Sequence, residues 1–134
     1  MKAEESAENY LETILMLSQI SSQVRSIDVA NELMFSRPSV SVAMKKLTEK
    51  KYIDIDAEGN ITLTESGRNV AEAMYERHVL ISDWLIFLGV DKKTAVSDAC
   101  KMEHDISDES FEAIRKHIEE YRREVYTGKK ETDR

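Results

Sequence analysis

One stretch of two-residue alternation interrupts a chain whose other segments follow a helical period. In "YIDIDAEGNITLT", residues 52–64, isoleucines alternate with aspartates before "AEGN", and apolar residues alternate with threonines after it. Alternation on both sides of a short turn sequence predicts an antiparallel β-hairpin. The chain has only one proline and four glycines in 134 residues, so long helices meet few breakers. The sequence therefore predicts a mainly α-helical fold with one small hairpin.

Three helical segments precede the hairpin. Residues 7–22, 26–34 and 35–53 each repeat apolar residues at helical spacing. In the third segment Ser36 takes the N-cap position and Pro38 the first turn. Three helices followed by a hairpin predict a winged helix-turn-helix with the hairpin as its wing. We place this domain at residues 1–64.

The distribution of charge indicates what the third helix binds. The net charge of −7 by itself argues against nucleic acid, because phosphate contacts need cations. Residues 37–51, however, hold five cations and one acid. In this architecture the third helix enters the major groove of double-stranded DNA, although exposed lysines also occur on ordinary solvated faces. The predicted DNA-binding residues are Ser36, Arg37, Pro38, Ser39, Ser41, Lys45 and Lys46.

The second half, residues 65–134, is expected to be a separate helical domain. Its helices are predicted at residues 64–90, 91–105 and 107–125, with Thr64, Asp91 and Ser107 as caps. The first of them contains "DWLIFLGV", which is apolar on all faces. Such a stretch needs more cover than one small domain offers, so we expect a homodimer formed by the C-terminal helices. A purely internal core is the alternative.

No segment of the sequence suggests a membrane or an oxidising compartment. No run approaches the roughly 18 apolar residues of a transmembrane helix, and the N-terminus "MKAEESAENY" is polar and acidic. A single cysteine excludes an intramolecular disulfide and is typical of a reducing compartment. We therefore expect a cytoplasmic protein.

A possible metal site begins with "CKMEHDIS", residues 100–107. Cys100, Glu103 and His104 share one face of a helix, at positions i, i+3 and i+4. Ligands from two other helices could close around a divalent ion; the candidates are Asn9, Glu12 and His78. Imidazole and carboxylate suit Fe²⁺, Mn²⁺ or Zn²⁺, and a thiolate shifts the preference toward Fe²⁺, Co²⁺ or Zn²⁺. The alternative is a buried cysteine beside surface residues.

Five stretches give the chain a family resemblance: "SAENYLETILML", "RPSVSVAMKKL", "LTESG", "ERHVLISDWLIFLGV" and "DACKMEHDISDE". Up to about Tyr121 the chain resembles the diphtheria-toxin-repressor family, and most of all its short manganese-transport-regulator type. That resemblance implies a winged-helix domain followed by a helical dimerisation domain. It also implies a repressor of metal-ion homeostasis genes, with Fe²⁺ or Mn²⁺ as corepressor and Zn²⁺ or Co²⁺ able to bind in vitro. No catalysis is implied.

The resemblance assigns metal ligands residue by residue. The manganese type would place Asp at position 9 and Glu at position 100, where this chain has Asn9 and Cys100. In having cysteine at position 100, the chain resembles the iron-responsive members of the family. The other four ligands are kept: Glu12, His78, Glu103 and His104. A second iron-type site is not expected, since Ser82 and Val96 replace its acid and histidine.

The implied mechanism joins the two domains. The first helix belongs to the DNA-binding domain and Cys100 to the dimerisation domain, so a shared ion would fix the spacing of two recognition helices. Asn9 keeps an alternative open, in which the metal site is degraded and DNA binding is independent of metal. An enzyme is not expected, because the chain contains no HExxH, nucleophile elbow or glycine-rich phosphate loop. A helical interaction module is disfavoured by the basic third helix and the hairpin.

Overall fold

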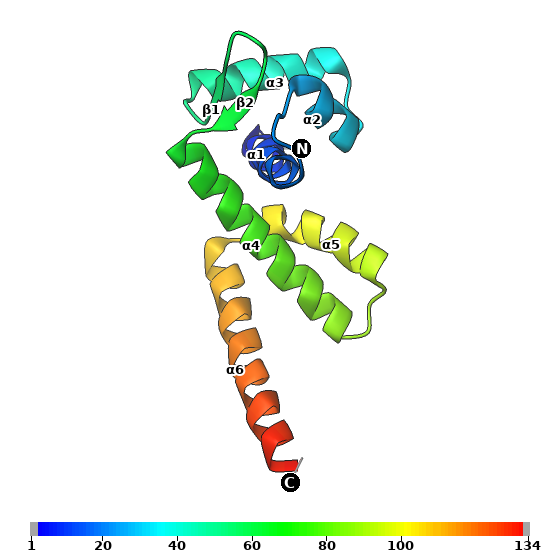
Figure 1. The fold of residues 1–134 in the computed structure, drawn as a ribbon. Helices are drawn as coiled ribbons and strands as arrows, with labels where there is room; N and C mark the ends of the chain where they lie inside the picture. Colours follow the sequence, from blue (N-terminus) through cyan, green and yellow to red (C-terminus); the bar gives the residue numbers. More distant parts are fainter. Residues whose placement is uncertain (1–2, 133–134) are drawn as a thin grey trace. The chain divides into compact units, whose positions relative to one another are not determined.

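The computed structural model describes the backbone of residues 3–132 and the side chains of residues 6–123. This part of the chain forms six helices and a two-stranded antiparallel sheet, as predicted (Figure 1). The elements are α1 (Ala3–Ile20), α2 (Ser26–Leu33), α3 (Arg37–Glu49), β1 (Ile53–Ile55), β2 (Ile61–Leu63), α4 (Glu65–Phe87), α5 (Lys92–Asp105) and α6 (Asp108–Thr132). Two compact units divide the chain: unit 1 is Met1–Glu76 and unit 2 is Arg77–Arg134. The domain boundary at 64/65 stays a prediction.

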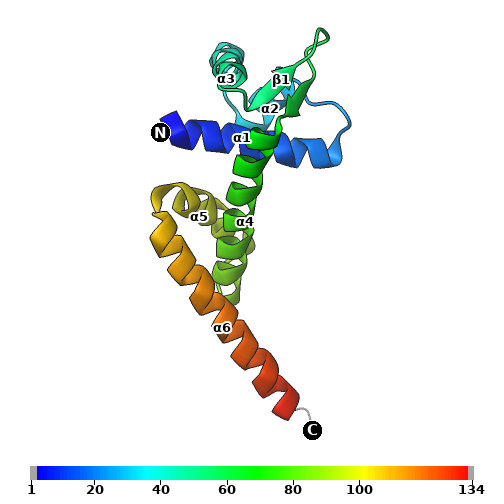
Figure 2. The same ribbon diagram turned by 90° about the vertical axis from the view of Figure 1, so that its left-hand side faces the viewer.

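Unit 1 has the architecture of a winged helix-turn-helix. Its hairpin pairs Ile53 with Leu63 and Ile55 with Ile61, and the tip of the hairpin projects from the unit (Figure 2). The amide of Ile61 donates to the carbonyl of Val24 at 2.7 Å, which fixes the hairpin to the loop before α2. The three helices and the hairpin share one buried core, which includes Leu11, Ile14, Val29, Val40, Met44, Leu47, Ile53 and Ile61.

Gly67, in the first turn of α4, lies against the backbone of Tyr52, between α3 and β1. A Cβ atom at this position would lie 1.9 Å from the carbonyl oxygen of Tyr52. Backbone cannot move away as a side chain can, so only glycine fits here. Thr64 caps the same turn, because its Oγ1 accepts from the amide of Gly67 at 3.1 Å and donates to the carbonyl of Lys51 at 2.7 Å. The close contact and the cap together fix where α4 starts.

Three other predicted caps, on α3, α5 and α6, are also present. Ser36 accepts from the amide of Ser39 at 3.3 Å, Asp91 from Lys93 at 3.2 Å, and Ser107 from Ser110 at 3.1 Å. Helix α4 ends at Phe87, just before Gly89, which takes a φ of +102°. The expected end of the last helix at residue 125 was wrong, since α6 continues to Thr132.

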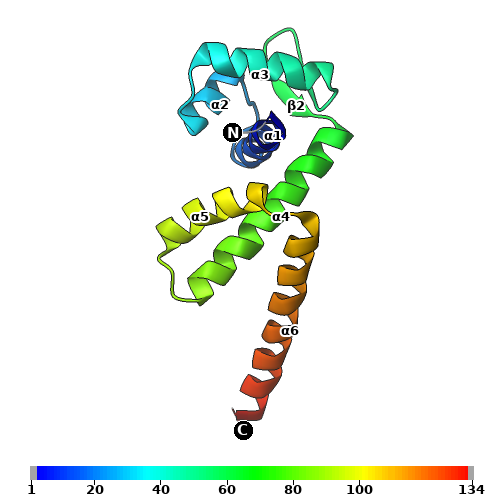
Figure 3. The same ribbon diagram turned by 180° about the vertical axis from the view of Figure 1, so that it is seen from behind.

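Unit 2 consists of the end of α4 together with α5 and α6. Its small core contains Ile81 of α4, Ala99 of α5 and Phe111 of α6. Helix α6 runs on past the loop that joins α4 to α5 (Figure 3). Within the described residues, no helix combines the length and apolar character that a membrane crossing requires.

Candidate metal centre and DNA-binding helix

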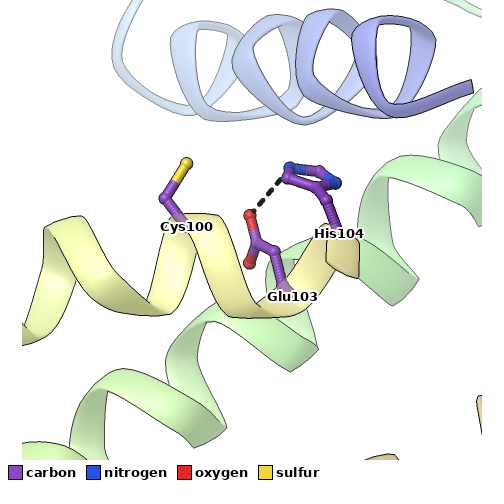
Figure 4. Close-up of side chains that lie close together, drawn as sticks. All are labelled: Cys100, Glu103 and His104. Atoms are coloured by element: carbon purple, nitrogen blue, oxygen red, sulfur yellow. Dashed lines mark ion pairs between the residues drawn. The ribbon is translucent and has the colours of Figure 1, made fainter. Parts of the chain in front are cut away.

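Helix α5 presents three donor side chains together. Ala95 and Ala99 are buried, so they set which side of α5 packs inward. Glu103 lies one helical turn beyond Ala99 and is completely buried. Cys100, Glu103 and His104 project from the same side of the helix (Figure 4). Each offers one ligand atom within 4.8 Å of those of the other two, as expected from the spacing.

His78, on α4, extends this group. Its Nδ1 atom lies 3.4 Å from Oε2 of Glu103, while Nε2 of His104 lies 3.2 Å from Oε1. The carboxylate of Glu103 therefore lies between two imidazoles, with one oxygen toward each. His78 and Glu103 are 25 positions apart in the chain, and they meet here because α4 and α5 pack in one unit. We name His78, Cys100, Glu103 and His104 the unit 2 donor cluster.

The electrostatics of the unit 2 donor cluster favour the binding of a cation. The pKa of His104 is raised to about 10, first by its hydrogen bond with Cys100 and then by that with Glu103. Partial burial acts in the opposite direction and does not prevail. One carboxylate, two imidazoles and one thiol are ligands that suit divalent transition metals. The donor set therefore fits such an ion, which would compete with protons for the same atoms.

The two remaining predicted ligands lie in unit 1. Asn9 and Glu12 are three residues apart in the middle of α1, so they share a face of that helix. The backbone carbonyl of Asn9 accepts a hydrogen bond from the hydroxyl of Thr13 at 2.8 Å. The predicted ligand set is therefore divided between the units: two residues in unit 1 and four in unit 2.

Helix α3 leaves the predicted DNA-binding residues exposed. Val40, Met44 and Leu47 form its buried stripe, and the opposite side faces solvent. At its N-terminus the hydroxyl of Ser36 donates to that of Ser39 at 2.8 Å. The exposed predicted residues are Ser36, Arg37, Pro38, Ser39, Ser41, Lys45 and Lys46. The helix can therefore present hydroxyl and cationic groups to DNA without disturbing its packing.

The wing differs in charge from the helix beside it. Residues 52–67 contain no Lys or Arg, and Asp54, Asp56 and Glu58 are all exposed on the hairpin. Hydrogen bonds from backbone amides, that of Asn60 first, lower the pKa of Asp56 and keep it anionic. Because phosphates repel carboxylates, the hairpin itself adds no electrostatic attraction for the DNA backbone.

Two family models match consecutive parts of the chain. Residues 2–60 match the iron-dependent repressor N-terminal DNA-binding domain, and residues 64–131 match the metal-binding and dimerisation domain of the same repressors. An uncharacterised HTH-type transcriptional regulator of Methanocaldococcus jannaschii is 34% identical over 123 residues, which is 90% of this chain and 98% of that protein. The transcriptional regulator MntR of Escherichia coli O6:H1 is 32% identical over 108 residues, 81% of this chain and 70% of that protein.

Solved structures show the same fold. The manganese regulator SloR matches with a TM-score of 0.74 and 28% identity, over 84% of this chain and 53% of that one. A manganese-dependent transcriptional repressor in complex with manganese matches with a TM-score of 0.74 and 31% identity, over 81% of this chain and 50% of that one. The chain thus spans about half the length of these two proteins.

Proposed function

This chain belongs to the iron-dependent repressor family, and from that membership we propose that it is a metal-dependent DNA-binding transcriptional repressor of metal-homeostasis genes. It acts in the cytoplasm as a homodimer on a double-stranded DNA operator, and it is not an enzyme. Fe²⁺ or Mn²⁺ is its corepressor. The observation that carries the proposal is the donor cluster, in which the buried carboxylate of Glu103 lies between His78 and His104.

We propose that Asn9 and Glu12 complete the ligand set from α1. Both lie on one face of a helix that packs on the core of unit 1. A bound divalent cation supplies positive charge that carboxylates from both units can share. Because α1 and α3 belong to the same unit, holding α1 against α5 also sets the position of α3. Selecting one arrangement of the units is the form of regulation we propose.

DNA binding against a metal series tests this function. We expect Mn²⁺ and Fe²⁺ (handled without oxygen) to promote a shift of operator DNA and EDTA to reverse it. A shift that persists in EDTA would favour the alternative, a winged-helix regulator whose degraded metal site no longer controls binding. Asn9, which replaces a charged carboxylate ligand of the manganese type with a neutral amide, is the feature that favours this alternative.

Cys100 is proposed to tune which ion the site prefers. A thiolate is a soft ligand from which the hard Mn²⁺ ion gains less than Fe²⁺ does. We expect Cys100→Glu to raise activation of DNA binding by Mn²⁺ relative to Fe²⁺, by about tenfold if one ligand changes in character. Operator binding titrated with each ion, without oxygen, measures the ratio. An unchanged ratio would mean that Cys100 is not a ligand.

The homodimer is proposed to form through the end of α4 and the middle of α6. Phe87 and Leu88 are 64% and 59% exposed, and the Phe87 ring meets that of Tyr121 edge to face at 5.7 Å. These residues border an apolar groove of about 570 Å³, whose lining also includes Trp84 and Ile118. An apolar surface of this kind indicates a protein partner, and a second copy supplies the same surface.

Charges placed in this groove are therefore expected to dissociate the dimer. Phe87→Glu with Leu88→Glu removes two apolar side chains per protomer, each contributing about 1.5–3 kcal/mol when fully buried. We expect the dimer dissociation constant to rise by at least about 100-fold, measured by sedimentation velocity. The control is Ile20→Glu with Met34→Glu, which changes two exposed apolar residues of unit 1. A dimer that survives the groove substitutions would place the interface elsewhere.

A further inference from the structure

We infer that Arg77 is a positioning residue that holds the metal-ligating end of α5, an inference that rests on the proposed metal function. Arg77 precedes His78 on α4, and its side chain is only 10% exposed. Its Nη1 donates to the backbone carbonyl of Glu103 at 3.0 Å, and its Nη2 donates to the carboxylate of Asp108 at 2.5 Å. One guanidinium thus links α4 to the last turn of α5 and the first residue of α6.

The carbonyl of Glu103 is a group that a helix cannot satisfy by itself. The last four carbonyls of any α-helix lack partners within that helix, and α5 ends at Asp105. Glu103 and His104 thus lie in the turn of α5 that would otherwise fray most readily. By donating to this carbonyl, Arg77 keeps the turn helical and with it the positions of both side chains.

The guanidinium is itself held rigidly. Its central carbon lies 4.6 Å from the centre of the Phe111 ring, and Phe111 is buried in the core of unit 2. A planar guanidinium that stacks on a ring and bonds through two nitrogens has little freedom left. Because His78 follows Arg77 directly, α4 contacts Glu103 twice: Arg77 at its carbonyl and His78 at its carboxylate.

Two effects of Arg77 on metal affinity would have opposite signs. If Arg77 positions Glu103 and His104, its removal weakens metal binding, because the ligands must be ordered when the ion binds. If its charge mainly repels a cation bound nearby, its removal strengthens metal binding. Arg77→Met removes both the charge and the bonds, while Arg77→Lys keeps the charge and loses the two-pronged geometry. The two substitutions together separate the effects.

The experiment combines two measurements on the full chain. The first is Mn²⁺ affinity, followed by the electron paramagnetic resonance signal of free Mn²⁺. We expect about a tenfold loss for both Arg77 variants, as for other residues that orient metal ligands. The second is the rate of amide hydrogen exchange over residues 100–105 of metal-free protein. We expect this rate to rise about tenfold in the Arg77 variants, because they lose a charge-assisted hydrogen bond to the Glu103 carbonyl. Unchanged exchange, or tighter Mn²⁺ binding by Arg77→Met, overturns the inference.

Control variants keep the test decisive. Arg115→Lys changes a second arginine that stacks on Phe111, at 5.2 Å, and it should leave exchange over residues 100–105 unchanged. If the Arg77 variants fail to fold, Asp108→Asn weakens only one of the two bonds, and it should raise exchange less but in the same direction. Absence of Mn²⁺ binding by the unmodified protein would refute the proposed function, while exchange in metal-free protein would still test Arg77.

Discussion

Reversing two charges on α3, by Lys45→Glu with Lys46→Glu, is expected to abolish operator binding at physiological salt. Each phosphate contact adds about 0.9 to the slope of log affinity against log salt. A dimer presents four of these lysines, so the slope should flatten by about 3.6. The affinity for DNA near 0.1 M salt should fall by about three to four powers of ten. This is about the change in affinity that a slope of about 3.6 produces when the salt concentration rises tenfold, from 0.1 to 1 M. The loss should be similar for all DNA sequences, because phosphates carry no sequence information.

The two lysines offer a clean test because both are exposed, while Met44 and Leu47 of the same helix hold the core. Salt titrations of operator and unrelated DNA measure the slope. The matched control is Lys92→Glu with Lys93→Glu, an equal change of charge on exposed residues at the start of α5. Operator affinity that survives the α3 substitutions would show that α3 does not contact the phosphates.

The second large effect is expected at Glu103. Glu103→Gln keeps the shape of a completely buried side chain but removes the negative charge between His78 and His104. Substituting a residue that only orients a metal ligand costs about 10- to 100-fold in metal affinity. Loss of a central ligand should therefore cost at least about 100-fold in metal affinity. DNA binding should then no longer respond to Mn²⁺ or Fe²⁺.

Calorimetric titration with Mn²⁺, together with an operator shift, measures both consequences. The control is Glu109→Gln, the same chemical change on an exposed residue of α6. Metal-free Glu103→Gln protein should keep its helical circular dichroism, which separates loss of the site from loss of the fold. A normal metal response in this variant would remove Glu103 from the ligand set.

The sequence allowed the elements of this fold to be predicted because their signals are local. Ile53 and Ile55 alternate with aspartates, and the hairpin forms there with Ile55 opposite Ile61. The hydroxyls of Ser36 and Thr64 cap helices by bonding amides three residues ahead. Where the signal was weak the prediction failed: nothing in the polar sequence after residue 125 indicated that α6 continues to Thr132.

The candidate site divides in the same way. Helical geometry alone brings Cys100, Glu103 and His104 together, because three- and four-residue steps return to one face. The sequence also offered His78, Asn9 and Glu12 as candidates on other helices, and the resemblance to a family then implied that they are ligands. Nothing in the sequence around "ERH" distinguishes Arg77 from a surface arginine, so its hydrogen bond to the Glu103 carbonyl could not be predicted.

Tertiary structure decided which distant groups meet. The packing of α4 on α5 places His78 3.4 Å from Glu103, and it brings the guanidinium of Arg77 to the Glu103 carbonyl and to Asp108. These partners are 25 to 31 residues apart, and no local periodicity relates them. Their distances depend on how Ile81, Ala99 and Phe111 pack in the core of unit 2. Short-range spacing and capping thus determined the elements and three of the donors, while core packing decided the environment of Glu103.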